Sequence, residues 1–72
     1  MSNRIGIGFI GAGEVSVMHG RGLRDLPGCE LVGLWNRTPA TAERRAAEEG
    51  CRVYATPQEL VRDPKIQAVL VL

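Results

Sequence analysis

The segment FIGAGEVSVMH, residues 9–19, joins a short apolar run to two closely spaced glycines and then to helix-forming residues. Before it, residues 4–10 are apolar and β-branched enough to form a strand that is buried on both faces of a sheet. After it, apolar residues recur at close to helical spacing over residues 14–26. Gly20 and Gly22 each cost about 1 kcal/mol relative to alanine in a helix, so we expect this helix backbone to pack closely against a strand. The segment therefore predicts a strand, a tight turn and a helix.

The rest of the chain repeats this alternation of strand and helix. Turn residues at 25–28 end the first helix, and Thr38-Pro39 provides an N-cap and a first helical residue for the next. Gly50 is placed to end that second helix, and residues 56–59 match a capping box with proline at the first helical position. The further strands are predicted at residues 30–35, 51–55 and 66–72, and the further helices at residues 39–49 and 57–62.

The resulting order, β-α-β-α-β-α-β, predicts an α/β fold with a parallel sheet and right-handed crossovers. This is the first half of a Rossmann-type doubly wound sheet. The chain ends on four apolar residues, 69–72, in a strand that a parallel sheet would bury on both faces. We therefore expect residues 1–72 to be the truncated N-terminal part of a Rossmann domain, with the remainder of that domain absent.

Composition narrows the classes of partner. The 72 residues have a formal net charge of +1 and no long block of one sign, which argues against nucleic acid and membrane surfaces. Cys29 and Cys51 lack the spacing of a metal site or a redox motif, so we expect them to be reduced and buried. There is no leader and no apolar run of about 18–20 residues, which predicts a cytoplasmic protein. Binding of a small molecule is the function class that is left.

The glycine turn matches the dinucleotide-binding fingerprint GxGxxG at its first two positions and has Ser16 at the third. The first glycine makes the tight turn, the second lets a pyrophosphate approach the backbone, and the third position must be small for close packing. The helix that follows points free N–H groups and its positive dipole end at the same spot. The alternative is a purely structural turn. The candidate cofactor contacts in this segment are Gly11, Ala12, Gly13, Glu14 and Val15.

The end of the second predicted strand carries Asn36, Arg37 and Thr38. An NAD site usually has Asp or Glu at this place, bound to the adenosine ribose hydroxyls. Without that carboxylate a 2′-phosphate is not repelled, and Arg37 can pair with it while Asn36 and Thr38 hydrogen-bond to it. This favours NADP over NAD. In the alternative interpretation Thr38 only caps the helix and Arg37 is a solvated surface charge.

With GFIGAGEVSVMH at residues 8–19 and LPGCELVGLWNRTP at residues 26–39, the chain resembles the N-terminal part of the Gfo/Idh/MocA family over essentially its whole length. The resemblance implies a two-domain NAD(P)-dependent oxidoreductase, homo-oligomeric, acting on sugars, inositols or related polyols. It also implies that the catalytic lysine and the acid/base groups follow the fourth strand and lie in a C-terminal substrate domain. Lys65 precedes that strand, so it is not expected to be the catalytic lysine. We expect no catalytic residue and no metal ligand in this chain. Asn36, where many members have Asp, departs from the family pattern and puts an NAD preference in doubt.

Three functions are compatible with these residues. The first is the cofactor-binding part of an oxidoreductase that transfers hydride between nicotinamide and a sugar-like alcohol or carbonyl. The second is a non-catalytic dinucleotide-binding module with a redox-sensing or regulatory role. The third, a flavodoxin-like domain that shares only the topology, fits the glycine spacing and the Asn36-Arg37-Thr38 segment less well. His19 lies in the second turn of the predicted helix, where we expect a packing or hydrogen-bonding role, and a part in the chemistry is the alternative.

Overall fold

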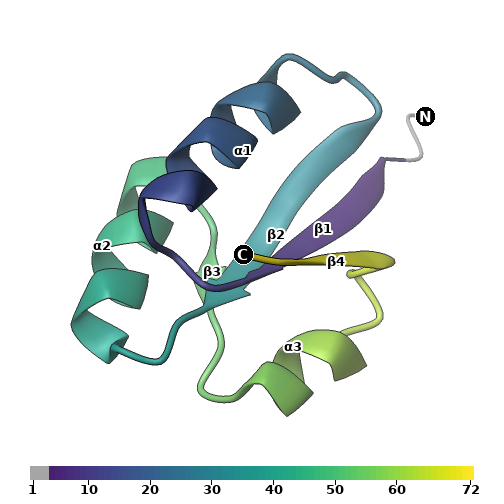
Figure 1. Cartoon of the computed structure of the whole chain (residues 1–72). Helices are drawn as coiled ribbons and strands as arrows, with labels where there is room; N and C mark the ends of the chain where they lie inside the picture. Colours follow the sequence, from purple (N-terminus) through teal and green to yellow (C-terminus); the bar gives the residue numbers. More distant parts are fainter. Residues whose placement is uncertain (1–3) are drawn as a thin grey trace.

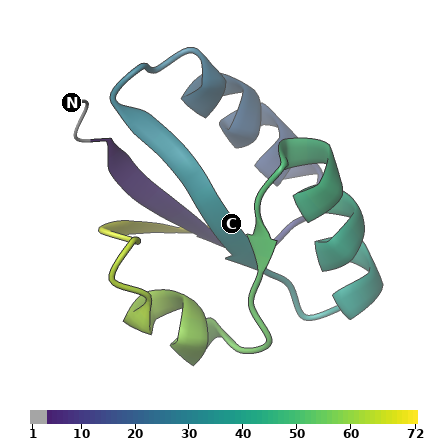
Figure 2. The same ribbon diagram turned by 180° about the vertical axis from the view of Figure 1, so that it is seen from behind.

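The computed structural model describes residues 4–72. Four parallel strands form one sheet in the order β3-β2-β1-β4, and α1 and α2 cover the face opposite to that covered by α3 (Figures 1 and 2). The strands are β1 Ile5–Ile10, β2 Cys29–Trp35, β3 Arg52–Val53 and β4 Ala68–Val71, and the helices are α1 Glu14–Arg24, α2 Pro39–Glu49 and α3 Pro57–Arg62. The predicted order of elements and the predicted fold class are therefore confirmed. β3 is only two residues long, shorter than predicted, because only residues 52 and 53 have register partners on β2.

The strand order reverses at β1. The chain moves from β1 to β2 and β3 in one direction and then crosses back through α3, so that β4 pairs with the other side of β1. Because all four strands are parallel, their carboxyl ends lie at one edge of the sheet. In doubly wound folds ligands bind outside the carboxyl ends of the strands at this switch point. The glycine turn that follows β1 lies at that place (Figure 1).

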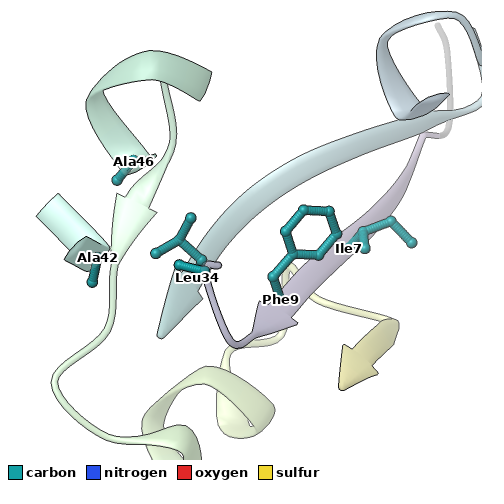
Figure 3. Packing of buried hydrophobic residues seen from close by; sticks show 6 residues of the cluster. Ile7, Phe9, Leu34, Ala42 and Ala46 are labelled. Atoms are coloured by element: carbon teal, nitrogen blue, oxygen red, sulfur yellow. The ribbon is translucent and has the colours of Figure 1, made fainter. Parts of the chain in front are cut away.

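The main core lies between the sheet and the helices α1 and α2. Ile7 and Phe9 of β1 and Leu34 of β2 pack with Ala42 and Ala46 of α2 (Figure 3). Phe9 and Leu34 are completely buried. The alanines have no side-chain bulk beyond Cβ, which lets the backbone of α2 approach the strands closely.

β2 contains an irregularity that changes which side chains face this core. Ile7 pairs with Leu31 but Gly8 pairs with Gly33, so Val32 is an extra residue in the register. Such a bulge interrupts the alternation of side chains along a strand. As a result Leu31 and Leu34, three residues apart, both contact the same core cluster. In a regular strand they would point to opposite faces.

A polar cluster ties the end of β3 to the turn between α3 and β4. The Tyr54 hydroxyl donates a hydrogen bond of 2.5 Å to Asp63 Oδ2, and the Arg52 guanidinium lies 5.2 Å from the centre of the Tyr54 ring. Burial and the bond to Asp63 raise the pKa of Tyr54 to about 12. The same bond lowers the pKa of Asp63. The cluster holds the chain in place where it returns from α3 to the sheet.

Candidate functional site

The first glycine of the turn is required by both conformation and space. Gly11 has a φ of +109°, which L residues rarely adopt, and its N–H donates to the Trp35 carbonyl at the end of β2 over 2.8 Å. A Cβ at Gly11 would lie 2.8 Å from the backbone oxygen of Leu72. The turn is thereby held between the ends of β2 and β4, the two neighbours of β1.

Asn36 braces the same turn from the end of β2. Its Oδ1 accepts a hydrogen bond of 3.0 Å from the N–H of Ala12, and its Nδ2 donates to the Thr38 carbonyl over 3.2 Å. Ala12 itself is 1% exposed, so this buried N–H is satisfied by a side chain from 24 positions away. Sequence reasoning considered Asn36 only as a cofactor contact and missed this bracing role.

The second glycine lies at an open position. Gly13 is the N-cap of α1, and nothing lies within 4 Å of the place where its Cβ would be. Glu14 and Val15, in the first turn of α1, are exposed. The first N–H groups of a helix have no partner within the helix, and together with the helix dipole they attract anions. The start of α1 therefore offers backbone donors to an anion, with no side chain in the way at Gly13.

Arg37 and Thr38 are exposed at the carboxyl end of β2, on the same edge of the sheet as the glycine turn. Thr38 occupies the N-cap position of α2, as predicted, but its side chain makes no capping hydrogen bond. Capping of α2 therefore does not account for the Thr38 hydroxyl. Both side chains face solvent, where a ligand can reach them.

A buried polar cluster lies between α1 and α2 and extends from Ser16, in the first turn of α1, to Arg24 at the end of that helix. Arg45 is only 4% exposed, and its Nε donates to Ser16 Oγ over 3.0 Å. Its other nitrogens pair with Glu48 Oε1 at 2.6 Å and Glu49 Oε2 at 2.7 Å, and Arg24 reaches Glu49 Oε1 at 2.5 Å. We call these five residues, Ser16, Arg24, Arg45, Glu48 and Glu49, the Arg45 network.

Hydrogen bonds within the Arg45 network shift the pKa values of Arg45 and Glu49. Burial by itself would lower the pKa of Arg45, but its hydrogen bonds to Glu48 and Glu49 raise that pKa above the ordinary value. Burial by itself would raise the pKa of Glu49, but the bonds from Arg24 and Arg45 lower it. Arg45 and Glu49 thus form a charged pair at neutral pH. No buried side-chain nitrogen or oxygen in residues 4–72 lacks a hydrogen-bond partner.

The two glycines inside α1 have different surroundings, which corrects the expectation that both pack against a strand. A Cβ on Gly20 would lie 2.3 Å from Glu49 Oε2, so Gly20 makes room for a side chain of α2. Nothing lies within 4 Å of a Cβ on Gly22, which is exposed. Close packing therefore explains Gly20 alone, and the element packed against it is helix α2 and not a strand.

This difference predicts opposite effects for two matched substitutions. Helix propensity favours alanine at both positions, so Gly22→Ala should stabilise the fold by about 0.5–1 kcal/mol. Gly20→Ala should instead destabilise it by about 1–3 kcal/mol, because Glu49 is held by Arg24 and Arg45 and does not yield freely to the new methyl group. Urea denaturation of the two variants measures the difference. A stabilised Gly20→Ala protein would show that the Arg45 network shifts easily.

The remaining candidate groups lie away from the glycine turn or make packing contacts. The His19 ring meets the Phe9 ring edge-on with centroids 6.5 Å apart, which supports a packing role. The backbone oxygen of Lys65 lies beside Gly6 near the start of β1, at the opposite end of the sheet from the turn. An open hollow of about 550 Å³, lined by Arg4, Lys65 and others, lies at that same opposite end.

Several classes of site are not found in residues 4–72. No group of three or more His, Cys, Asp or Glu side chains there is arranged to hold a metal ion. No helix in that range is long and apolar enough to cross a membrane. Cys29 and Cys51 are free and half-buried, and burial raises the pKa of Cys51 to about 11, which keeps its thiol protonated at neutral pH.

A parallel sheet with a glycine turn between its first strand and first helix, at the point where the strand order reverses, defines the class of Rossmann-type dinucleotide-binding folds. Within this class, residues 5–72 match the family described as "Oxidoreductase family, NAD-binding Rossmann fold", GFO_IDH_MocA. The chain belongs to this family, as the resemblance in the sequence indicated.

Solved structures of the same kind share this fold. An NAD binding oxidoreductase from Klebsiella pneumoniae is 35% identical with a TM-score of 0.81, over 96% of this chain and 21% of its own. A myo-inositol dehydrogenase from Lactobacillus casei, in complex with NAD(H) and myo-inositol, is 29% identical with a TM-score of 0.87 over 96% and 21%. A biliverdin reductase from Synechocystis, in complex with biliverdin and NADP+, is 27% identical with a TM-score of 0.86 over 93% and 21%. The chain thus spans about a fifth of each of these structures. No curated protein matched the sequence.

Proposed function

We propose that this chain is the cofactor-binding part of an oxidoreductase whose complete form transfers hydride between a nicotinamide cofactor and a sugar- or polyol-like alcohol or carbonyl. The observation that carries this proposal is the open start of α1 at Gly13, next to the point where the strand order reverses. Family membership and the NAD(H) and NADP+ in the matching structures support it. The substrate class rests on the family resemblance and on the myo-inositol bound by one of these structures.

The residues of this chain fit the pyrophosphate and adenosine end of such a cofactor. Gly11 and Asn36 hold the turn in shape, while Gly13 leaves the backbone N–H groups of the first turn of α1 open to the phosphates. Glu14 and Val15 contribute backbone contacts at this helix start. The bound nicotinamide supplies or accepts the hydride. The chain's part is to bind and orient it, and we propose that the substrate and the proton-transferring groups are held outside residues 1–72.

We further propose that the cofactor is NADP(H) rather than NAD(H). β2 is followed by Asn36-Arg37-Thr38, without the carboxylate that would repel a 2′-phosphate. Arg37 and Thr38 are exposed at the edge of the sheet that carries the glycine turn. The Arg37 guanidinium offers paired donors to a phosphate. Asn36 Oδ1 is occupied by the Ala12 N–H, and Nδ2 uses one of its two protons on the Thr38 carbonyl, which leaves one N–H for the phosphate.

Titration with NADPH and NADH tests both parts of this proposal, and Arg37→Ala separates them. We expect the variant to bind NADPH more weakly by about 1–3 kcal/mol, the range for a charge-assisted hydrogen bond, and NADH with little change. Quenching of Trp35 fluorescence, or calorimetry, gives the two dissociation constants.

Arg44→Ala is the matched control, since Arg44 is an exposed arginine in the middle of α2, and it should bind both cofactors as the unchanged protein does. Equal losses for NADPH and NADH in Arg37→Ala would contradict the role at the 2′-phosphate. Binding of neither cofactor by the unchanged, folded protein would contradict the proposed function itself.

A further inference from the structure

The Arg45 network is not explained by stability or by charge. Buried ion pairs are often no more stabilising than well-packed apolar residues of the same volume, so the fold alone does not call for a buried arginine. The charges of Arg24 and Arg45 are balanced by those of Glu48 and Glu49, so the network projects little net positive charge towards a phosphate. What it does provide is a chain of directed hydrogen bonds.

These hydrogen bonds connect α2 to the glycine turn. Arg45 Nε donates to Ser16 Oγ, and Ser16 Oγ donates to the Gly13 carbonyl over 2.6 Å. A serine hydroxyl has one proton and rotates to suit its partners. Because Arg45 has only donors, it occupies a lone pair of Ser16 Oγ and leaves the hydroxyl proton for Gly13. The Gly13 carbonyl also accepts the Ser16 N–H at 3.0 Å, so the peptide that begins α1 is held by two bonds.

We propose that Arg45 is a positioning residue for the cofactor's pyrophosphate, acting through Ser16 on the Gly13 peptide. The proposal rests on the function proposed above. The orientation of this peptide sets where the N–H groups that follow Gly13 point, and those are the groups that a phosphate at the start of α1 would meet. Serine at the third fingerprint position thus does more than supply a small side chain. A glycine there would leave the buried Arg45 Nε without its partner.

The test is the affinity of the purified protein for NADPH and NADH after Ser16→Ala, which keeps the side chain small and leaves every ion pair of the network in place. We expect both dissociation constants to rise by about three- to tenfold, the effect of losing one net hydrogen bond. The two rises should be equal, because the pyrophosphate is common to both cofactors. Measurements are made well below the melting temperature, where circular dichroism shows the variant folded.

Arg45→Lys provides a second variant, which retains the positive charge beside Glu49 but lacks the Nε donor. It should raise both dissociation constants as Ser16→Ala does, and the double variant should bind no more weakly than the weaker single one, because both remove the same connection. Arg44→Lys, on the exposed face of α2, is the control and should bind as the unchanged protein does.

Three results would overturn the proposal. Ser16→Ala with a lower melting temperature but unchanged dissociation constants would mean that the network serves stability alone. A loss for NADPH only would place the effect at the 2′-phosphate. Losses that multiply in the double variant would mean that Ser16 and Arg45 act independently. If the unchanged protein bound neither cofactor, the proposed function would fail and this inference with it, whereas the three results above leave that function intact.

Discussion

Gly13→Val is expected to abolish cofactor binding while the protein remains folded. Gly13 has a φ of −77° and a ψ of −166°, an extended conformation with negative φ, and nothing lies within 4 Å of its Cβ position. The Cβ of the new side chain therefore has open space around it. It fills the space in front of the first N–H groups of α1, where a pyrophosphate would have to approach. We expect the dissociation constants for NADH and NADPH to rise by at least about 100-fold, or roughly 2.7 kcal/mol.

The matched control is Gly22→Val, the same substitution near the other end of α1. Gly22 also has open space around its Cβ position, so the substitution is tolerated there, but this position is more than two turns away from Gly13. We expect unchanged affinity for both cofactors. Fluorescence titration, together with thermal unfolding of both variants, makes the comparison. A folded Gly13→Val protein that still bound NADPH would show that the pyrophosphate does not lie at this turn.

Gly11→Ala is expected to damage the fold, although it is the smaller substitution in the same motif. The residue has a φ of +109°, and its Cβ would lie 2.8 Å from the backbone oxygen of Leu72, so either the turn or the end of the β4 segment must shift. Backbone strain of about 1–3 kcal/mol and overpacking of about 1–3 kcal/mol give an expected loss of about 2–6 kcal/mol. Urea denaturation measures that loss.

Gly50→Ala separates the two contributions. Gly50 also has a positive φ, +70°, but nothing lies within 4 Å of its Cβ position, so alanine there meets strain without a clash. We expect a loss of about 1–2 kcal/mol at Gly50, the cost of a left-handed conformation. A Gly11→Ala protein that loses no more than the Gly50→Ala protein would mean that the end of β4 moves aside. Together with Gly13→Val, these variants test whether Gly11 is needed for the fold and Gly13 for binding of the cofactor.

Local patterns in the sequence were sufficient to predict the elements and their order. The apolar run before Gly11, the proline after Thr38 and the glycine at position 50 each act on their immediate neighbours, through backbone conformation and helix ends. Thr56, whose hydroxyl accepts the N–H of Glu59 at 3.1 Å, makes one of the two hydrogen bonds of the predicted capping box. The handedness rule for parallel strands applies to any such alternation and fixes the hand of each crossover, whereas the reversal of the strand order at β1 is a feature of the tertiary structure.

The sequence by itself thus determined the α/β class, the family and the place of the glycine turn, because each of these depends on residues that are neighbours along the chain. The tertiary structure decided which residues hold that turn: Asn36 bonds to Ala12 from 24 positions away, and Arg45 to Ser16 from 29. It also distinguished Gly20 from Gly22, which have the same helix propensity but different neighbours. Such contacts depend on the way α2 is packed against α1 and the sheet, and no local pattern of residues encodes that packing.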